Sequence, residues 1–161
     1  MVTPWTNLKD TVTSILFCNG VKGINFKNFA FFSQLKSVSI PNSVRSIGPG
    51  AFFSCDQLRT CTIPKNVQTI GWNPFACCTN LTSVFVDIDN PYFISCEGIV
   101  FTKDLTSVVS CPSGKSGAYI LPDSVINVLE CAFWGCRFLN EVIFPENWNL
   151  WAMDASTTAM D

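Results

Sequence analysis

The sequence predicts a solenoid, in which short strands joined by helical turns wind into stacked coils. Residues 35–58 (LKSVSIPNSVRSIGPGAFFSCDQL) and residues 58–81 (LRTCTIPKNVQTIGWNPFACCTNL) carry apolar residues at matching positions, with a constant offset of 58 − 35 = 23 in residue number. A fixed period of this length is the signature of stacked repeats. The composition, 48% hydrophobic and only 14% charged, argues against a disordered chain.

Each repeat is expected to begin with a short strand. Val38, Ser39 and Ile40 alternate between apolar and polar, which suits a strand with one buried face. Pro41 ends this strand because proline has no N–H to donate to a neighbour. The apolar segment 51–55 is too short for an independent helix, so we expect a helical turn that is held by packing.

We expect the whole chain, residues 1–161, to form one repeat domain. Its parts are an N-terminal flank (1–11), repeats (12–86), an irregular hairpin coil (87–118), further repeats (119–147) and a C-terminal flank (148–161). In the irregular coil, residues 99–101 and 107–109 are predicted to be two strands of a hairpin around Lys103 and Asp104. Pro4 and Trp5 are expected to cover the first coil, and Trp148 and Trp151 the last.

The motif L-x-x-V-x-I-P-x-x-V-x-x-I-G-x-x-A-F-x-x-C-x-x-L resembles the BspA-like leucine-rich repeats, a family of surface antigens. Residues 35–58 carry the whole motif, and residues 58–81 depart from it mainly at Cys61 and at residues 73–75. Residues 89–112 look like the hairpin insertion common in that family. The resemblance implies a right-handed leucine-rich-repeat superhelix, a bacterial or protist surface protein associated with adhesion and protein binding, and no catalytic residues.

One outward-facing column of the predicted strands is unusually apolar. Its members are Leu16, Ser39, Thr62, Phe85, Ile120 and Ile143. Because large exposed apolar patches often mark partner surfaces, we predict that this column lies on a protein-binding face. Two alternatives stay open at this point: the hairpin or a terminus covers part of the sheet, or the strand register is shifted.

The residues that suggest chemistry do not form a convincing catalytic site. The chain has no histidine, which removes the commonest general base at neutral pH. Residues 113–116 (SGKS) resemble the end of a phosphate-binding loop, but Val109 stands where that motif requires glycine. Asp87, Asp89 and Glu97 are interpreted as turn-forming or solvated acids. We therefore expect no enzyme activity and no cofactor.

The nine cysteines are interpreted as packing residues. Cys55, Cys78 and Cys136 occupy one column of the repeat, and Cys61 lies in a column otherwise held by Val or Ile. A free cysteine packs as a small apolar residue. The absence of histidine and of a C-x-x-C pair also argues against a structural zinc site. A disulfide framework is the less favoured alternative.

Charge and segment composition limit the partners and the location. A net charge of −2 with scattered basic residues predicts no nucleic-acid partner. The start MVTPWTNLKD does not resemble a signal peptide, and no apolar run approaches the roughly 20 residues that span a bilayer, so no direct membrane insertion is expected. The family resemblance implies the cell surface, whereas a complete chain of this kind would be cytoplasmic. The alternative function is a structural segment of a longer surface repeat protein.

Overall fold

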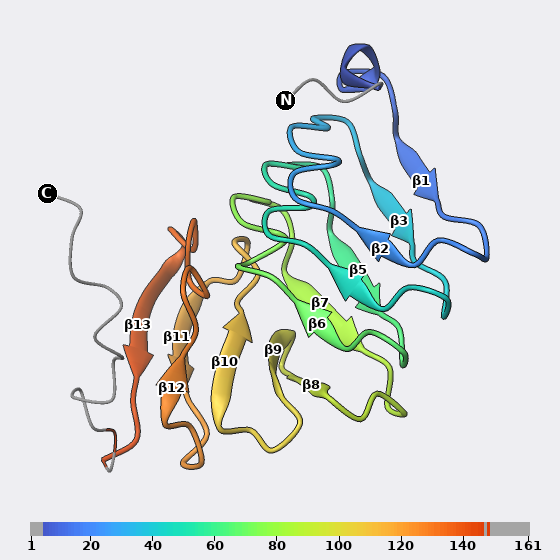
Figure 1. Cartoon of the computed structure of the whole chain (residues 1–161). Helices are drawn as coiled ribbons and strands as arrows, with labels where there is room; N and C mark the ends of the chain where they lie inside the picture. Colours follow the sequence, from blue (N-terminus) through green and yellow to red (C-terminus); the bar gives the residue numbers. More distant parts are fainter. Residues whose placement is uncertain (1–4, 147, 149–161) are drawn as a thin grey trace, which may run out of the picture.

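The computed structural model describes residues 5–146 and 148, which form a stack of coils (Figure 1). Six coils each contribute one strand to a first face: β1 (Ser14–Leu16), β3 (Ser37–Ser39), β5 (Thr60–Ile63), β7 (Ser83–Val86), β11 (Gly117–Ile120) and β13 (Leu139–Ile143). In the parallel pair β1–β3, Ser14 lies opposite Ser37, and in β5–β7, Thr60 lies opposite Ser83. Residues that are one sequence period apart therefore lie opposite each other on neighbouring strands, and the predicted solenoid is confirmed.

A second face is built from strands of only two residues, which the sequence analysis did not predict. They are β2 (Gly23–Ile24), β4 (Ser46–Ile47), β6 (Thr69–Ile70) and β12 (Asn127–Val128). Ile24, Ile47 and Ile70 align in the parallel ladder β2–β4–β6. The two ladders enclose the core, in which Leu58 is fully buried.

The predicted helical turns are wrong. Among the described residues the only helix is η1 (Thr6–Leu8), a short 3-10 helix before the first coil. On the third side of the coils, backbone N–H groups bond to the next coil instead: Phe52 N donates to Pro74 O at 2.8 Å and Ser54 N to Ala76 O at 2.9 Å. Ser54 has φ of 54°, and the equivalent Cys77 has φ of 61°. A residue in this left-handed region cannot continue a right-handed helix.

The irregular coil contains the predicted hairpin and one further strand. Strands β9 (Ile99–Thr102) and β10 (Ser107–Ser110) pair antiparallel as predicted, and β8 (Phe93–Cys96) pairs antiparallel with β9. Strand β10 also pairs in parallel with β12, so the chain returns to the second face after the hairpin. Asn90 anchors the start of the irregular coil to the preceding one, because its buried amide donates to Pro64 O at 2.9 Å and to Val67 O at 3.1 Å.

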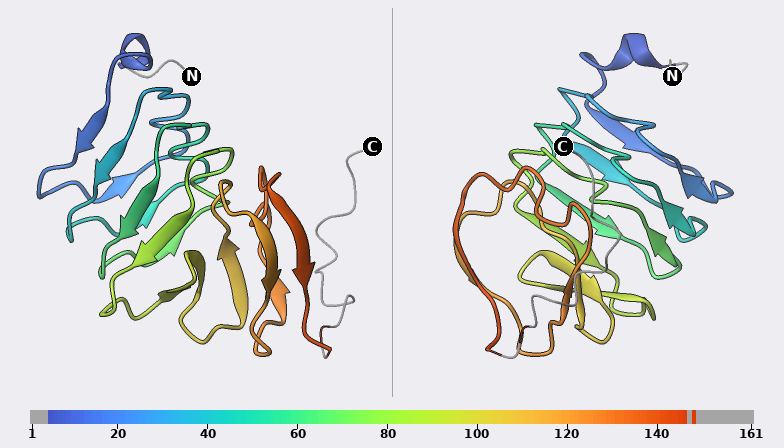
Figure 2. Two further views of the ribbon diagram at one scale, coloured as in Figure 1. Left: turned by 180° about the vertical axis from the view of Figure 1, so that it is seen from behind. Right: turned by 60° about the vertical axis from the view of Figure 1, so that its left-hand side comes forward.

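The first face is not one continuous sheet. The pairs β1–β3, β5–β7 and β11–β13 are hydrogen-bonded, whereas β3 and β5 are not paired with each other. Beyond β7 the hairpin follows, and Val84 N donates to Gly98 O at 2.9 Å. Figure 2 shows the strands of the first four coils stacked on one side of the hairpin and β11 and β13 on the other. The right-handed sense of the superhelix stays a prediction.

Asn73 connects the third coil to the coil of residues 131–134. Its buried side chain donates to Cys131 O at 3.1 Å and to Ala132 O at 3.3 Å, and lies 3.5 Å from Trp134 O. It also accepts a hydrogen bond from the Ser110 hydroxyl at 2.7 Å. The departure from the motif at residue 73 therefore has a structural role that the repeat pattern alone does not reveal.

The core contains the cysteine column, and its thiols are free. Cys55 Sγ donates to Phe29 O at 3.2 Å, and Cys78 Sγ donates to Phe52 O at 3.0 Å. The thiols thus link each coil to the preceding one, as packing residues with a weak donor.

Aromatic residues pack at both ends of the described stack. The ring of Trp5 stacks on Phe29 with centroids 5.2 Å apart, and that of Trp148 on Phe144 at 4.1 Å. Pro4 and Trp151 lie outside the described residues.

Candidate binding face

All six residues of the predicted binding column lie on the first face and are exposed. Leu16 and Ile120 have 74% and 69% of their surface exposed, and Phe85 and Ile143 have 49% and 41%. Ser39 and Thr62 are also exposed. The outward direction follows from the two-residue alternation of a strand, which leaves Cys61 and Ile63 of β5 buried and Thr60 and Thr62 exposed.

The strand register matches the predicted column. Leu16 lies opposite Ser39, Thr62 opposite Phe85, and Ile120 opposite Ile143. The alternative of a shifted register is therefore excluded for these three pairs. Their exposure also excludes a hairpin that covers them.

The structure divides this column into two parts that the sequence did not separate. Leu16, Ser39, Thr62 and Phe85 come from β1, β3, β5 and β7, while Ile120 and Ile143 come from β11 and β13. In the first part the apolar residues lie at the two ends, with the hydroxyl side chains of Ser39 and Thr62 between them. The second part is an adjacent isoleucine pair.

The neighbouring outward column is mostly polar. Its members are Ser14, Ser37, Thr60, Ser83, Ala118 and Glu141. Ala118 lies opposite Glu141, in the same register as the other pairs. The face therefore combines a few large apolar side chains with short hydroxyl groups, a composition that suits a polar interface with apolar anchors.

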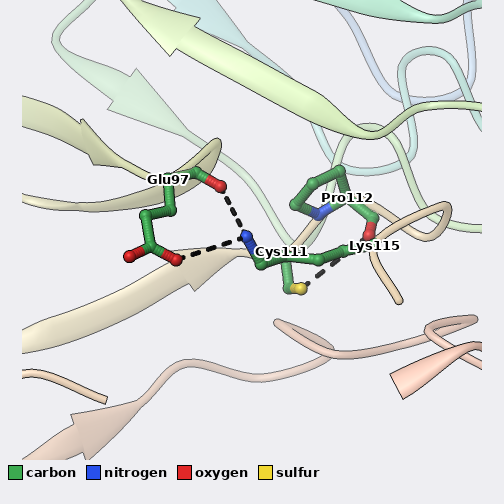
Figure 3. Close-up of polar contacts among 4 residues, drawn as sticks. All are labelled: Glu97, Cys111, Pro112 and Lys115. Carbon is green, nitrogen blue, oxygen red and sulfur yellow. Dashed lines mark hydrogen bonds and ion pairs between the residues drawn. The ribbon is translucent and has the colours of Figure 1, made fainter. Parts of the chain in front are cut away.

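The segment that resembles a phosphate-binding loop is occupied by internal contacts. The Ser113 hydroxyl is buried, accepts from Cys77 N at 2.9 Å and donates to Trp134 O at 3.2 Å. Figure 3 shows the Lys115 ammonium group between two oxygens of Glu97: it donates to the backbone carbonyl at 2.6 Å and lies 3.9 Å from the carboxylate. These contacts hold the tip of the β8–β9 hairpin and leave no cradle for a phosphate.

The other residues singled out for chemistry also have structural contacts. Asp87 accepts a hydrogen bond from Asp89 N at 3.0 Å, in the manner of a turn-forming acid. Glu97 is engaged by Lys115, so the three acids of the sequence analysis do not share one role. Within residues 5–146 and 148, no three potential ligands of His, Cys, Asp or Glu come together as a metal site.

Burial and pairing, rather than activation, set the chemistry of the core thiols. Burial raises the pKa of Cys61 to about 12. The hydrogen bond with Cys136 and burial both raise the pKa of Cys111, while the same contact lowers the pKa of Cys136. Cys111 is buried and Cys136 half-buried, so the pair belongs to the core between β10 and the last coils.

The comparison with known proteins agrees with this architecture. Residues 7–112 and 109–155 match the BspA type Leucine rich repeat region, in six copies. The chain belongs to this family of leucine-rich repeats. None of the curated proteins matches the sequence.

Three solved structures share the repeat fold. A leucine-rich cell surface protein from Faecalibacterium prausnitzii is 25% identical, with a TM-score of 0.73, over 83% of this chain and 36% of that one. The pneumococcal vaccine antigen PcpA is 24% identical, with a TM-score of 0.61, over 85% of this chain and 46% of that one. A leucine-rich repeat protein from Eubacterium ventriosum is 19% identical, with a TM-score of 0.53, over 88% of this chain and 50% of that one. The chain therefore spans half the length of these proteins or less.

The family consists of repeat scaffolds, which generally mediate protein interactions. The descriptions of the similar structures name no ligand and no reaction. No helix in the described part of the chain is long and apolar enough to cross a membrane.

Proposed function

We propose that this chain is a non-enzymatic scaffold that binds another protein through its first face. The observation that carries the proposal is the exposure of Leu16, Phe85, Ile120 and Ile143 on aligned strands of that face. Ile120 and Ile143 form an adjacent exposed apolar pair, and Leu16 and Phe85 add single apolar side chains at the two ends of the other part of the face. Exposed apolar groups of this kind often mark interaction surfaces. A few buried side chains supply most of the energy of many interfaces, so a small number of anchors on this face is sufficient for binding.

The proposal is tested by identifying a partner in a pull-down from the natural source and measuring its affinity for the purified chain. Phe85→Ser tests the part of the face formed by β1, β3, β5 and β7, and Ile143→Ser tests the part formed by β11 and β13. At least one of them is expected to weaken binding tenfold or more, about 1.4 kcal/mol, because it removes an anchor.

The matched control is Ile126→Ser, because Ile126 is an exposed isoleucine outside the first-face strands. All variants are first compared by circular dichroism with the parent chain, so that only folded proteins enter the measurement. Undiminished binding by both face variants, or an equal loss in the control, contradicts the proposal.

The second candidate function is a structural segment of a longer surface repeat protein. The last described coil favours it, because a hollow of about 260 Å³ opens there onto Phe133, Cys136, Leu139 and Val142. The equivalent residues Phe52, Cys55 and Leu58 are fully buried by the coils on either side. A further coil would cover these side chains in the same way.

A cell-surface location is part of this second proposal. The similar structure from Faecalibacterium prausnitzii is described as a cell surface protein. Immunofluorescence on intact and permeabilised cells tests this location, and labelling only after permeabilisation contradicts it.

A further inference from the structure

A hollow of about 280 Å³ opens on the first face where β3, β5 and β7 end. It is lined by Val38, Ser39, Ile40, Asn42, Thr62, Pro64 and Asp87. Strands β3, β5 and β7 follow one another in the stack and point the same way (Figure 1 and Figure 2). The hollow lies beside the missing pairing between β3 and β5, so it interrupts the sheet within the proposed binding face.

The hollow has an apolar floor and a polar rim. Val38 and Ile40 are only half-buried, whereas the equivalent residues Cys61 and Ile63 on β5 are buried. The hydroxyls of Ser39 and Thr62 form no hydrogen bond with another described side chain. A ligand that enters the hollow would therefore meet apolar carbon below and unpaired oxygen atoms at its sides.

Asp87 gives the hollow its charge. Its backbone N–H donates to Ile63 O at 2.9 Å, which fixes the residue at the end of β5. One carboxylate oxygen accepts from Asp89 N, and Asp87 forms no ion pair with any residue that the structure describes. On the hairpin, the Lys103 ammonium group donates to the carbonyl of Ile88 at 3.3 Å. The carboxylate is half-buried and keeps an oxygen available for a ligand.

Phe85 adds an aromatic ring beside the rim of the hollow. Phe85 does not line the hollow itself, but it lies opposite Thr62, which does, and both side chains are exposed on the first face. About half of the surface of Phe85 is exposed. An aromatic ring at the rim of a hollow that also holds a carboxylate attracts a cation that can stack.

We infer that this hollow binds an arginine side chain of the protein partner. The guanidinium group pairs with the Asp87 carboxylate and stacks on Phe85, and its methylene groups lie over Ile40 and Pro64. The inference rests on the proposed function, because it names the chemistry by which the first face recognises its partner. The hollow is slightly smaller than the roughly 300 Å³ of the smallest pockets for drug-sized ligands, so it suits one side chain.

Arginine fits these groups better than lysine does. A guanidinium group is planar, stacks on aromatic rings and presents several N–H donors to carboxylate and hydroxyl oxygens at once. An ammonium group is more strongly hydrated and has no planar face. The combination of Phe85, Asp87 and two hydroxyls therefore selects for the planar cation.

The inference is tested by nuclear magnetic resonance on the full ¹⁵N-labelled chain, with N-acetyl-arginine-N-methylamide as the probe. Saturable shifts are expected at the amides of Ser39, Thr62 and Asp87, with millimolar affinity. The citrulline analogue, which has the same shape without the charge, is expected to bind at least fivefold more weakly. The lysine analogue is expected to bind at least twofold more weakly.

Variants separate the hollow from general surface charge. Asp87→Asn is expected to weaken probe binding at least fivefold, while Asp89→Asn, one acid further along the same turn, changes it less than twofold. Thr62→Val provides a second variant and is expected to weaken binding two- to threefold if Asp87→Asn does not fold. Non-saturable shifts, equal binding of citrulline, or equal effects of the two acid variants overturn the inference.

The outcome is distinguishable from that of the proposed function. If Phe85→Ser and Ile143→Ser weaken partner binding but the arginine probe does not bind, the proposed binding face is supported and the arginine site is refuted. If the probe binds in the hollow but Phe85→Ser and Ile143→Ser leave partner binding unchanged, the arginine site is supported and the proposed binding face is refuted.

Discussion

Replacing Asn73 by alanine should destabilise the chain by about 3 kcal/mol. The side chain donates two protons to a group of three carbonyl oxygens and accepts one hydrogen bond from Ser110, which amounts to three buried hydrogen bonds. Each such bond contributes about 1 kcal/mol net, and a buried partner left unpaired costs about 1–3 kcal/mol. For a chain of this size, about 3 kcal/mol corresponds to a fall in Tm of about 6–12 °C.

Thermal and urea unfolding of Asn73→Ala and Asn66→Ala measure this effect against a matched control. Asn66 also bridges two coils, but through one exposed hydrogen bond to Asn42 O at 2.8 Å. Its replacement is expected to cost less than about 1 kcal/mol. Asn73→Asp should be worse than Asn73→Ala, because it places a carboxylate against carbonyl oxygens. If Asn73→Ala melts within about 2 °C of Asn66→Ala, the assignment of Asn73 as the link between the coils is refuted.

Three further predictions concern the core, the hairpin and the thiols. Leu58→Ala should cost about 2–5 kcal/mol in urea unfolding and Arg59→Ala less than about 0.5 kcal/mol, because only Leu58 is buried; equal midpoints would reject the repeat phase. Threonine hydroxyl and amide donors lower the pKa of Asp104, so the turn is stabilised above the usual carboxyl pKa of about 4 and this contribution is lost as pH falls through the lowered value. The protection factors of the amides of residues 103–106, which compare exchange with the intrinsic rate at each pH, should fall at low pH in the parent but not in Asp104→Asn. A maleimide at pH 7 should label exposed Cys18 well before buried Cys61, whose pKa is about 12; equal rates would contradict the burial.

The period of the sequence predicted the register and the inward columns because both depend on local apolar alternation. Leu35, Leu58 and Leu81 are each fully buried, and each is separated from the next by one period of the repeat. Every coil repeats the same environment, so one motif determines its neighbours' contacts. The same reasoning placed Leu16 and Phe85 outward.

The helical turns could not be excluded by this reasoning because the apolar spacing of residues 51–55 suits either a helical turn or a series of other turns. The conformation is decided by bonds to the next coil, such as Phe52 N to Pro74 O. The two-residue strands of the second face escaped prediction for a related reason. Two residues are too few to show an alternation.

The two buried asparagines look like breaks in the motif when only the sequence is considered. Asn90 lies one period after Val67, and Asn73 lies one period after Gly50. A polar residue in a repeat column can be exposed, or it can be buried with partners from distant coils. The partners of Asn73 lie 58 and 59 residues away, beyond any local pattern.

The hollow at the strand ends was also beyond prediction from the repeat. It depends on the lack of pairing between β3 and β5 and on side chains from three successive coils. In the sequence, Ser39 and Thr62 belong to the outward column, whereas Asp87 is one of several acids in a turn. Only their common position shows that they surround one space.

The regular register of the strands has a consequence for how such a chain changes during evolution. Successive coils pack through the same buried columns, so removal or duplication of one unit such as residues 35–57 keeps these columns in contact. Recombination within the gene can therefore lengthen or shorten the stack in whole units without requiring a new core. Exposed strand positions are then free to diversify from copy to copy, while the buried columns stay under the constraint of stacking.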